Sequence, residues 1–357
     1  MVRHAIRRTT AVSVTVTAAL VSLTLLVFSC AEQEPSPQRE VEFVLGTASA
    51  VTIYGDADPE LFQEVFGRLR EIEQKMSVST DDYDDTELLE VNRQAGVRPV
   101  QVSEDTFEVV SAALDYSRLT EGAFEVTIGP VVSLWGIGTS TERIPLPGEI
   151  ERALELVGFD EVVLDPETRS IYLPREGMKL DVGGIAKGYA ADEAARILEE
   201  AGVEHAILDF GGNIMLIGGR PGGGDWRIGV QNPVSNRGSF IGILGVQDRT
   251  IVTSGNYERY FITANGTRYH HIIDHEDGYP TRNGLTSVSI LADESMAADA
   301  LSTAVYVMGL ERGMELVNSL EGVDAAFVTE DMVVHMTGGF RENFQLTDEA
   351  FTLADES

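Results

Sequence analysis

The feature that most constrains the fold is a repeated change in the spacing of the hydrophobic residues. Between residues 59 and 75 the apolar side chains recur every three or four positions, which predicts an amphipathic helix. Further helices are predicted at about 104–121, 149–157, 185–201 and 299–308. Residues 42–54 alternate instead and predict a strand, whereas 161–173 and 260–269 are typical of hairpins. Helices interleaved with hairpins predict one α+β domain, with mixed or antiparallel sheets and flanking helices.

The strongly acidic charge of the chain limits the classes of partner that it can bind. It carries 58 acidic and 26 basic residues, a formal net charge of −32. Such a chain repels nucleic acid and anionic membrane surfaces, so a basic binding patch for either is not expected. It can still bind phosphates through cations or backbone amides.

The N-terminal segment is typical of a secretory signal. Three arginines precede an apolar run at about 11–28, and Ser29 stands before Cys30, the only cysteine. Residues 1–29 resemble a bacterial lipoprotein signal peptide, with Cys30 as the lipidated residue. The alternative is a plain signal anchor with an incidental cysteine. Residues 30–41 are polar and contain proline, so we expect a flexible tether that leaves a folded domain at 42–350. The expected location is extracytoplasmic, anchored by lipid to a bacterial membrane (on the periplasmic side in a Gram-negative cell).

The segment 179–192, KLDVGGIAKGYAAD, is the most distinctive motif. A strand ends in Asp181, the pair Gly183–Gly184 lets the backbone approach another group closely, and a helix begins. Free amides at a helix start favour an anion, above all phosphate, and Lys187 adds a positive charge. In the alternative interpretation Asp181 only caps the helix and the glycines only form a turn.

Another segment, 294–304, places Asp299 and Thr303 four residues apart, hence on one face of a helix. A carboxylate beside a hydroxyl suits Mg²⁺, which takes few protein oxygens and keeps other positions for water and phosphate. The alternative is an acid that complements the helix dipole and a threonine bonded within its own helix.

The segments 253–259 and 269–274 leave several interpretations open. Ser254, His271 and Asp274 offer the residue types of a hydrolase triad, but the chain lacks a G-x-S-x-G elbow. His271 can instead act as an acid or base for a hydroxyl nucleophile, or be structural. A transition metal on the pair His270–His271 is not expected, because adjacent strand residues point to opposite faces.

Seven motifs in order resemble the ApbE family, the FAD:protein FMN transferases of bacteria. The resemblance runs from about residue 45 to about 346. It rests on GAFEVTIGP with LWGIG (122–138), LDVGGIAKGYAAD, DFGGN, WRIGV, TSGNYER, HIID and ADALST.

The resemblance implies an ApbE-like fold and a set of site residues. FAD would be contacted by Leu45, Ala123, Phe124, Glu125, Asp181, Lys187 and Ile273. Mg²⁺ would be held by Asp299, Thr303 and the backbone carbonyl of Gly184. His271 would assist the attacking hydroxyl, and Asp299 would be catalytic because it holds the metal. The chain departs from the family pattern at Leu45, where Met is usual, at Glu125, where Asp is usual, and at His275 and Glu276, where Pro and Arg are common.

The implied reaction moves FMN from FAD to a threonine of an acceptor protein through a phosphoester and releases AMP. The expected acceptors are membrane or extracytoplasmic redox proteins. Two alternatives remain: an FAD pyrophosphatase that gives FMN and AMP, and a non-catalytic flavin-binding lipoprotein. A solute-binding lipoprotein shares the anchor and the tether but does not need the ordered motifs.

Overall fold

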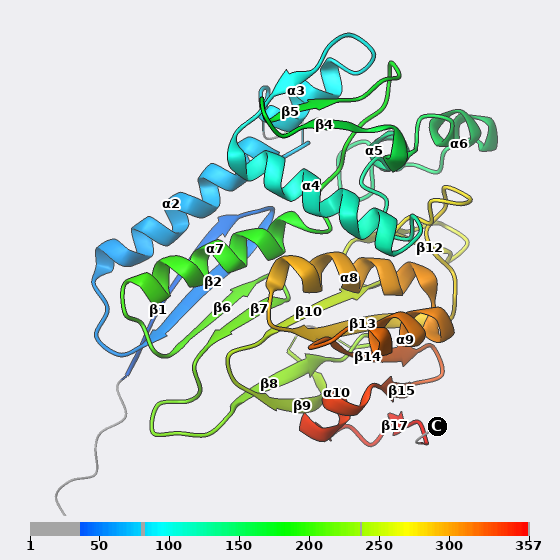
Figure 1. Cartoon of the computed structure of the whole chain (residues 1–357). Coiled ribbons are helices and arrows are strands. Elements are labelled where there is room, and N and C mark those ends of the chain that lie inside the picture. Colours follow the sequence, from blue (N-terminus) through cyan, green and yellow to red (C-terminus); the bar gives the residue numbers. More distant parts are fainter. Residues whose placement is uncertain (1–35, 80–82, 236–237, 356–357) are drawn as a thin grey trace, which may run out of the picture. The chain divides into compact units, whose positions relative to one another are not determined.

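A large sheet of nine strands is the centre of the structure. A computed structural model describes residues 36–79, 83–235 and 238–355, and Figure 1 shows its arrangement. The strand order is β1-β2-β6-β7-β10-β13-β14-β15-β17. Every neighbouring pair is antiparallel except β15 and β17, so the sheet is mixed. Its strands are β1 Pro37–Val44, β2 Thr47–Tyr54, β6 Ala206–Phe210, β7 Asn213–Ile217, β10 Thr250–Gly255, β13 Leu285–Ala292, β14 Asp324–Thr329, β15 Val333–Met336 and β17 Thr352–Leu353.

Helices cover one face of this sheet and a smaller sheet covers the other (Figure 1). The covering helices are α2 Pro59–Met76, α7 Ala186–Glu200, α8 Ser295–Met308 and α9 Leu310–Ser319, and α4 Glu104–Leu119 packs on α2 and α8. On the other face β8 Trp226–Gln231, β9 Phe240–Val246 and β16 Phe344–Leu346 form a three-stranded sheet, with α10 Gly338–Asn343 beside it. Separate hydrophobic clusters fill the two interfaces, as expected for a sheet that buries both faces.

The remaining elements are short. They are α3 Glu87–Arg93, α5 Gly129–Trp135, α6 Pro147–Leu154, the 3₁₀ turn η1 Phe159–Glu161, the small sheet of β3 Val100–Gln101, β4 Val163–Asp165 and β5 Ser170–Tyr172, and the hairpin of β11 Tyr260–Ile262 and β12 Arg268–His270. The α+β class with mixed and antiparallel sheets is thus confirmed, as are the predicted hairpins.

Helix α2 follows directly from its sequence. Asp58 accepts a hydrogen bond from the Glu60 N–H at 2.9 Å, and Pro59 occupies the first helical position. Its apolar residues, at helical spacing from Phe62 to Met76, are all buried. The helix therefore has the bounds that hydrophobic periodicity predicts, to within one residue.

The predicted strand over 42–54 is wrong as a single element. The chain reverses at Leu45 and Gly46, whose φ angles are +59° and +66°. Two successive positive φ angles define the tight hairpin turn that joins β1 to β2. Residues 37–41, which the sequence assigned to the tether, belong to β1, and β17 extends the fold beyond residue 350. The predicted signal peptide, Cys30 and the first part of the predicted tether lie outside the described residues.

Within the described part of the chain, no helix is long and apolar enough to cross a membrane.

Candidate active site

The start of α7 is built around a turn closed by Asp181. The Asp181 Oδ1 accepts a hydrogen bond from the Gly183 N–H at 2.8 Å. Helix α7 itself begins at Ala186, with Ile185 at the N-cap and no side chain capping it. Asp181 therefore stabilises the double-glycine turn and does not cap the helix, which corrects the alternative interpretation of this motif.

Asp299 reaches this helix start from α8. Its carboxylate is 3% exposed, and both of its oxygens lie 3.3 Å from Lys187 Nζ. The Gly188 N–H donates a further hydrogen bond to Asp299 Oδ2 at 3.0 Å. Two amides of this segment, those of Gly183 and Gly188, are thus occupied by acids of the chain itself and are not free for an anion.

Gly184 brings a third segment to the same place. A Cβ atom on Gly184 would lie 3.2 Å from the ring of Phe124 and 3.2 Å from Thr303 Oγ1. The Asp181 N–H also donates to the Val126 carbonyl at 2.8 Å. The segments around 124, 184 and 303 are therefore in contact, although 179 residues separate the first from the last in sequence.

The hydroxyl groups of Ser254 and Ser302 lie beside the hydroxyl of Thr303 and form a small hydrogen-bonded group. Ser254 Oγ lies 3.5 Å from Thr303 Oγ1 and 2.9 Å from Ser302 Oγ, and Ser302 Oγ donates to the Asp299 carbonyl. Ser254 therefore supports the turn of α8 that carries Thr303. The hydrolase triad does not form, because Asp274 accepts from the Glu276 N–H and no hydrogen bond joins it to His271 or Ser254.

The two histidines differ in their surroundings. His270 is buried, and its Nε2 lies 2.9 Å from the Thr281 carbonyl, which makes it a structural residue. His271 Nδ1 lies 3.2 Å from the Arg259 carbonyl. His271 is partly exposed, but the loss of water around its ring, together with the charges of Arg259, His270 and Lys187, lowers its pKa well below 6.5. His271 is therefore neutral at pH 7, with Nδ1–H donating to the carbonyl and Nε2 left as the proton acceptor.

The other predicted FAD-binding residues make no such contact with Lys187, Asp299, Gly184 or Thr303 among the described residues. Glu125 Oε1 accepts from Thr127 N and Oγ1, and burial raises the pKa of this carboxyl above its usual value. Leu45 packs on the edge of the core cluster that contains Phe124. Ile273 belongs to a separate cluster around Trp135. The structure thus places Lys187, Asp299, Gly184, Phe124 and Thr303 together, with Asp181 beside them.

The donor set fits a hard cation of the Mg²⁺ type. No group of three or more His, Cys, Asp or Glu side chains suited to a metal ion occurs among the described residues. The predicted ligands are instead one carboxylate, one hydroxyl and one carbonyl, and all three atoms are oxygens, as Mg²⁺ prefers. Asp299 is already balanced by a cation, the Lys187 ammonium. A buried acid that attracts positive charge, one helical turn before Thr303, is consistent with such a site.

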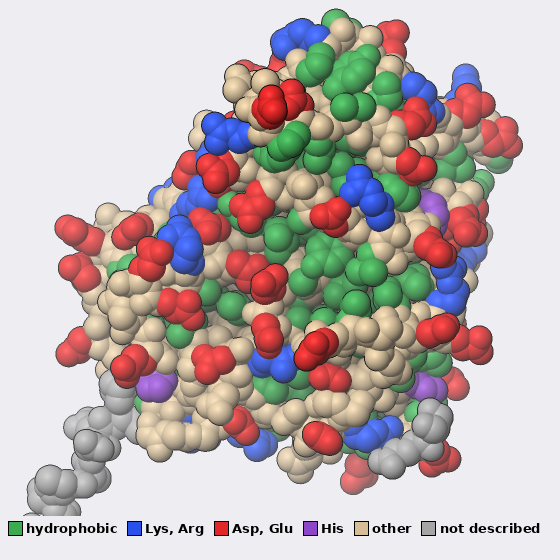
Figure 2. Space-filling model, viewed as in Figure 1, with side chains coloured by type: hydrophobic (Ala, Val, Ile, Leu, Met, Phe, Trp, Pro, Cys, Tyr) green, Lys and Arg blue, Asp and Glu red, His purple; other side chains and the backbone are tan. Residues whose placement is uncertain are grey.

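The molecular surface agrees with the overall charge. On the face in Figure 2, acidic side chains are spread over the whole surface and basic ones are scattered among them. A long-range attraction for an anionic ligand is therefore not expected, and any such ligand depends on local cations.

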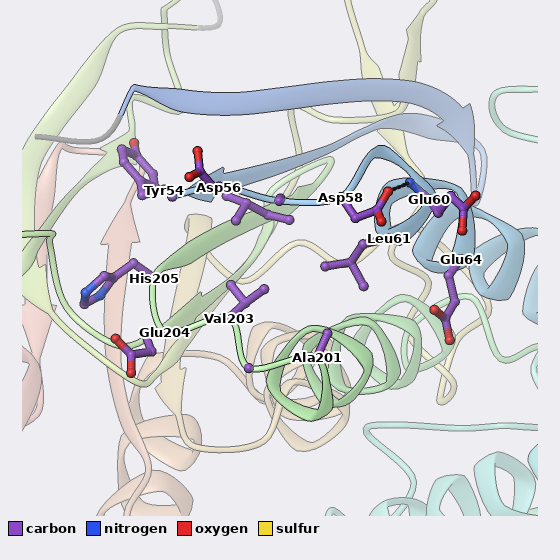
Figure 3. Close-up of a pocket in the computed structure, with 14 residues that line it drawn as sticks. Tyr54, Asp56, Asp58, Glu60, Leu61, Glu64, Ala201, Val203, Glu204 and His205 are labelled. Atoms are coloured by element: carbon purple, nitrogen blue, oxygen red, sulfur yellow. Dashed lines mark hydrogen bonds between the residues drawn. The ribbon is translucent and has the colours of Figure 1, made fainter.

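Two cavities lie outside the predicted site. One, of about 510 Å³, is lined by acids that include Asp56, Asp58 and Glu204 (Figure 3). It also contacts Ala201 at the C-terminal end of α7, which is about 20 Å along the helix from Lys187. The other, of about 1180 Å³, contains His270 but not His271. Neither contains a predicted FAD or metal residue.

Comparison with known proteins agrees with the fold and with the motifs. The model of the ApbE family matches residues 45–327. A Klebsiella pneumoniae protein named FAD:protein FMN transferase is 33% identical over 312 residues, which cover 87% of this chain and 95% of that protein. A Treponema pallidum protein of the same name is 34% identical over 329 residues, covering 87% and 90%.

Solved structures give the same result. The crystal structure of the ApbE protein from Thermotoga maritima has a TM-score of 0.79 and 32% identity, and the match covers 86% of this chain and 99% of that one. The flavin transferase ApbE from Vibrio cholerae has a TM-score of 0.76 and 29% identity, covering 86% and 100%.

Fold and site together define an α+β protein in which the start of α7 meets a buried acid of α8. The chain belongs to the ApbE family.

Proposed function

We propose that this protein is a Mg²⁺-dependent FAD:protein FMN transferase that attaches FMN to a threonine of an acceptor protein. The observation that supports the proposal most strongly is the convergence of four residues from the start of α7 and the middle of α8, namely Gly184, Lys187, Asp299 and Thr303. The relatives above carry the name of this activity.

The reaction is a phosphoryl-group displacement. The acceptor Oγ bonds to the phosphorus on the FMN side of FAD, the bond from that phosphorus to the bridging oxygen breaks, and AMP leaves with the bridging oxygen. The threonine proton must go to a base, and the negative charge that develops on the leaving phosphate must be balanced.

The chain's own residues supply both functions. His271 has its Nδ1–H directed at the Arg259 carbonyl, so its neutral Nε2 is the group that accepts the threonine proton. Lys187 can turn from Asp299 toward the pyrophosphate and contribute one positive charge. A bound Mg²⁺, held by Asp299, Thr303 and the Gly184 carbonyl, would supply Lewis-acid stabilisation of the phosphate oxygens.

The anchor belongs to the same proposal. Lipidation of Cys30 and an extracytoplasmic location on a bacterial membrane would place the enzyme beside membrane-bound or extracytoplasmic redox proteins as acceptors.

An FAD pyrophosphatase is the main alternative, because water can replace the threonine at the same site. The two are separated by running the reaction in H₂¹⁸O with a threonine-bearing acceptor. A transferase leaves the FMN phosphorus without ¹⁸O and joins it to the acceptor, whereas a pyrophosphatase releases free FMN with one ¹⁸O. A flavin-binding lipoprotein leaves FAD intact.

A further inference from the structure

Helices α7 and α8 are held together by a contact that the proposed reaction does not use. Asp192, on α7, accepts hydrogen bonds from the Ser295 N–H at Oδ1 and from the Met296 N–H at Oδ2, each at 2.8 Å. These are the first two amides of α8, and no side chain of α8's own N-cap, Glu294, caps them. The N-terminus of α8 is thus capped from another helix, 103 residues earlier in the chain.

The two helices also approach each other closely at this point. A Cβ atom on Gly188 would lie 2.2 Å from the Ser295 carbonyl oxygen and 2.6 Å from Met296 Cα. Only glycine permits this approach. Gly188 and Asp192 are four residues apart on α7, and Ser295 and Asp299 are four apart on α8, so each pair lies on one helix face.

Along these two faces, α7 and α8 run antiparallel. Asp192 binds the first turn of α8, whereas Gly188 donates to Asp299, one turn later. Contacts at both ends of the paired faces fix how far one helix can slide along the other.

Ser295, the first residue of α8, is also bonded to the large sheet through its side chain. Ser295 is fully buried, and its Oγ donates to Asn213 Oδ1 at 2.7 Å. Thr250 Oγ1 lies 3.0 Å from Ser295 Oγ. Strands β7 and β10 of the large sheet therefore hold the same residue whose amide Asp192 caps.

We infer that Asp192 is a positioning residue: it fixes the register of α8 against α7 and so holds Asp299 and Thr303 opposite Gly184 and Lys187. The inference rests on the proposed metal role of Asp299 and Thr303. Because the three proposed ligands come from two elements, a shift of one helix separates the Gly184 carbonyl from the other two. Metal sites need their ligands held to within about 0.5 Å, so such a shift weakens metal binding.

A metal-binding measurement without FAD tests this. Mn²⁺ serves as the probe, titrated into the full chain and followed by its electron paramagnetic resonance signal. Asp192→Ala is expected to raise the Mn²⁺ Kd at least tenfold. Asp192→Asn keeps the side-chain volume and one of the two hydrogen bonds, so it is expected to lower Tm less than the alanine variant and to raise the Kd by less. It provides the measurement if the alanine variant fails to fold.

Asp58→Ala is the matched control. Asp58 caps α2 through the Glu60 N–H, and it lies in neither α7 nor α8. Both alanine variants lose a helix cap and lower Tm, but only the change at Asp192 should alter the Kd for Mn²⁺. A second readout is turnover: the Asp192 variants should need more Mg²⁺ for half-maximal FAD cleavage and recover most of the wild-type rate at saturating Mg²⁺.

The outcomes separate the two claims. A wild-type protein that binds no Mn²⁺ contradicts the proposed metal site and this inference with it. A wild-type protein that binds Mn²⁺, with folded Asp192 variants of unchanged Kd, overturns this inference and leaves the proposed function standing.

Discussion

Lys187 Nζ lies 3.3 Å from each carboxylate oxygen of Asp299. The two residues are 112 positions apart in the chain and come from different helices. Asp299 is 3% exposed, so its charge is stabilised by the lysine and by the Gly188 N–H and hardly by water. This pair joins the residue proposed to bind FAD to the residue proposed to bind the metal.

Asp299→Asn is expected to abolish Mg²⁺-dependent FAD cleavage while the protein stays folded. The amide keeps the size of the side chain but removes the charge that attracts a cation. AMP release measures activity, and circular dichroism measures folding. The control is Asp115→Asn, an exposed acid on α4 whose ion pair with Arg118 is worth at most about 1 kcal/mol. Full activity in Asp299→Asn would remove the metal assignment.

Lys187→Ala is expected to raise the FAD Kd about tenfold, equivalent to about 1.4 kcal/mol of binding free energy. The variant loses one positive charge near the pyrophosphate. It also frees Asp299 from its ion pair, so its affinity for Mn²⁺ should be equal to or greater than that of the wild type. Flavin fluorescence quenching gives the first constant, and Lys179→Ala, half-buried beside Ser133, is the control. An unchanged FAD Kd would show that Lys187 only balances Asp299.

The pH profile of transfer tests His271 as the base. Its lowered pKa keeps it neutral at pH 7, so kcat/KM should stay flat through pH 6.5 and fall only at a pH well below that value. Arg259→Gln removes a positive charge that disfavours the imidazolium form, which raises the pKa of His271 and moves the acid limb to higher pH.

Asp192 complicates that profile, because burial raises its pKa to about 6. The comparison with Arg259→Gln separates the two groups, since Arg259 is among the charges that act on His271 and is not among the causes of the Asp192 shift. A limb that stays in place in Arg259→Gln would exclude His271 as the titrating base.

Gly188→Ala is expected to destabilise the fold by about 2–3 kcal/mol, because the added methyl group meets the Ser295 backbone at 2.2 Å. Gly67→Ala is the matched change in another helix interior. A Cβ there would meet no atom closer than 4.0 Å, so this variant should gain about 0.5–1 kcal/mol. Urea unfolding of both variants gives the two free energies. Equal effects would mean that α7 and α8 do not approach as closely as the structure has them.

Much of this arrangement is visible in the sequence, and the exceptions have physical causes. Periodicity finds α2, α4 and α7 because each has a single buried face. It misses the turn at Leu45, a non-glycine residue at positive φ within an alternating segment. It also starts α8 four residues late, at Asp299 and not at Ser295, because the cap comes from Asp192 in another helix and leaves no local signal.

For the site, too, the sequence reveals the residues with local signals and misses those that depend on contacts between distant segments. The motifs identify Lys187, Asp299 and Thr303, since residue type and spacing carry the chemistry. They give no role to Asp192 or Ser295, whose function depends on a contact between distant segments. Ser254 draws attention as a nucleophile, whereas in the structure it supports Thr303.

The mass of an acceptor protein tests the proposed FMN transfer most directly. The purified protein is incubated with FAD, Mg²⁺ and a protein domain that carries an acceptor threonine, and AMP, free FMN and the acceptor mass are followed together. The acceptor is expected to gain one FMN for each AMP released, and EDTA is expected to prevent both. FAD that stays bound but intact in the presence of Mg²⁺ and acceptor would contradict it.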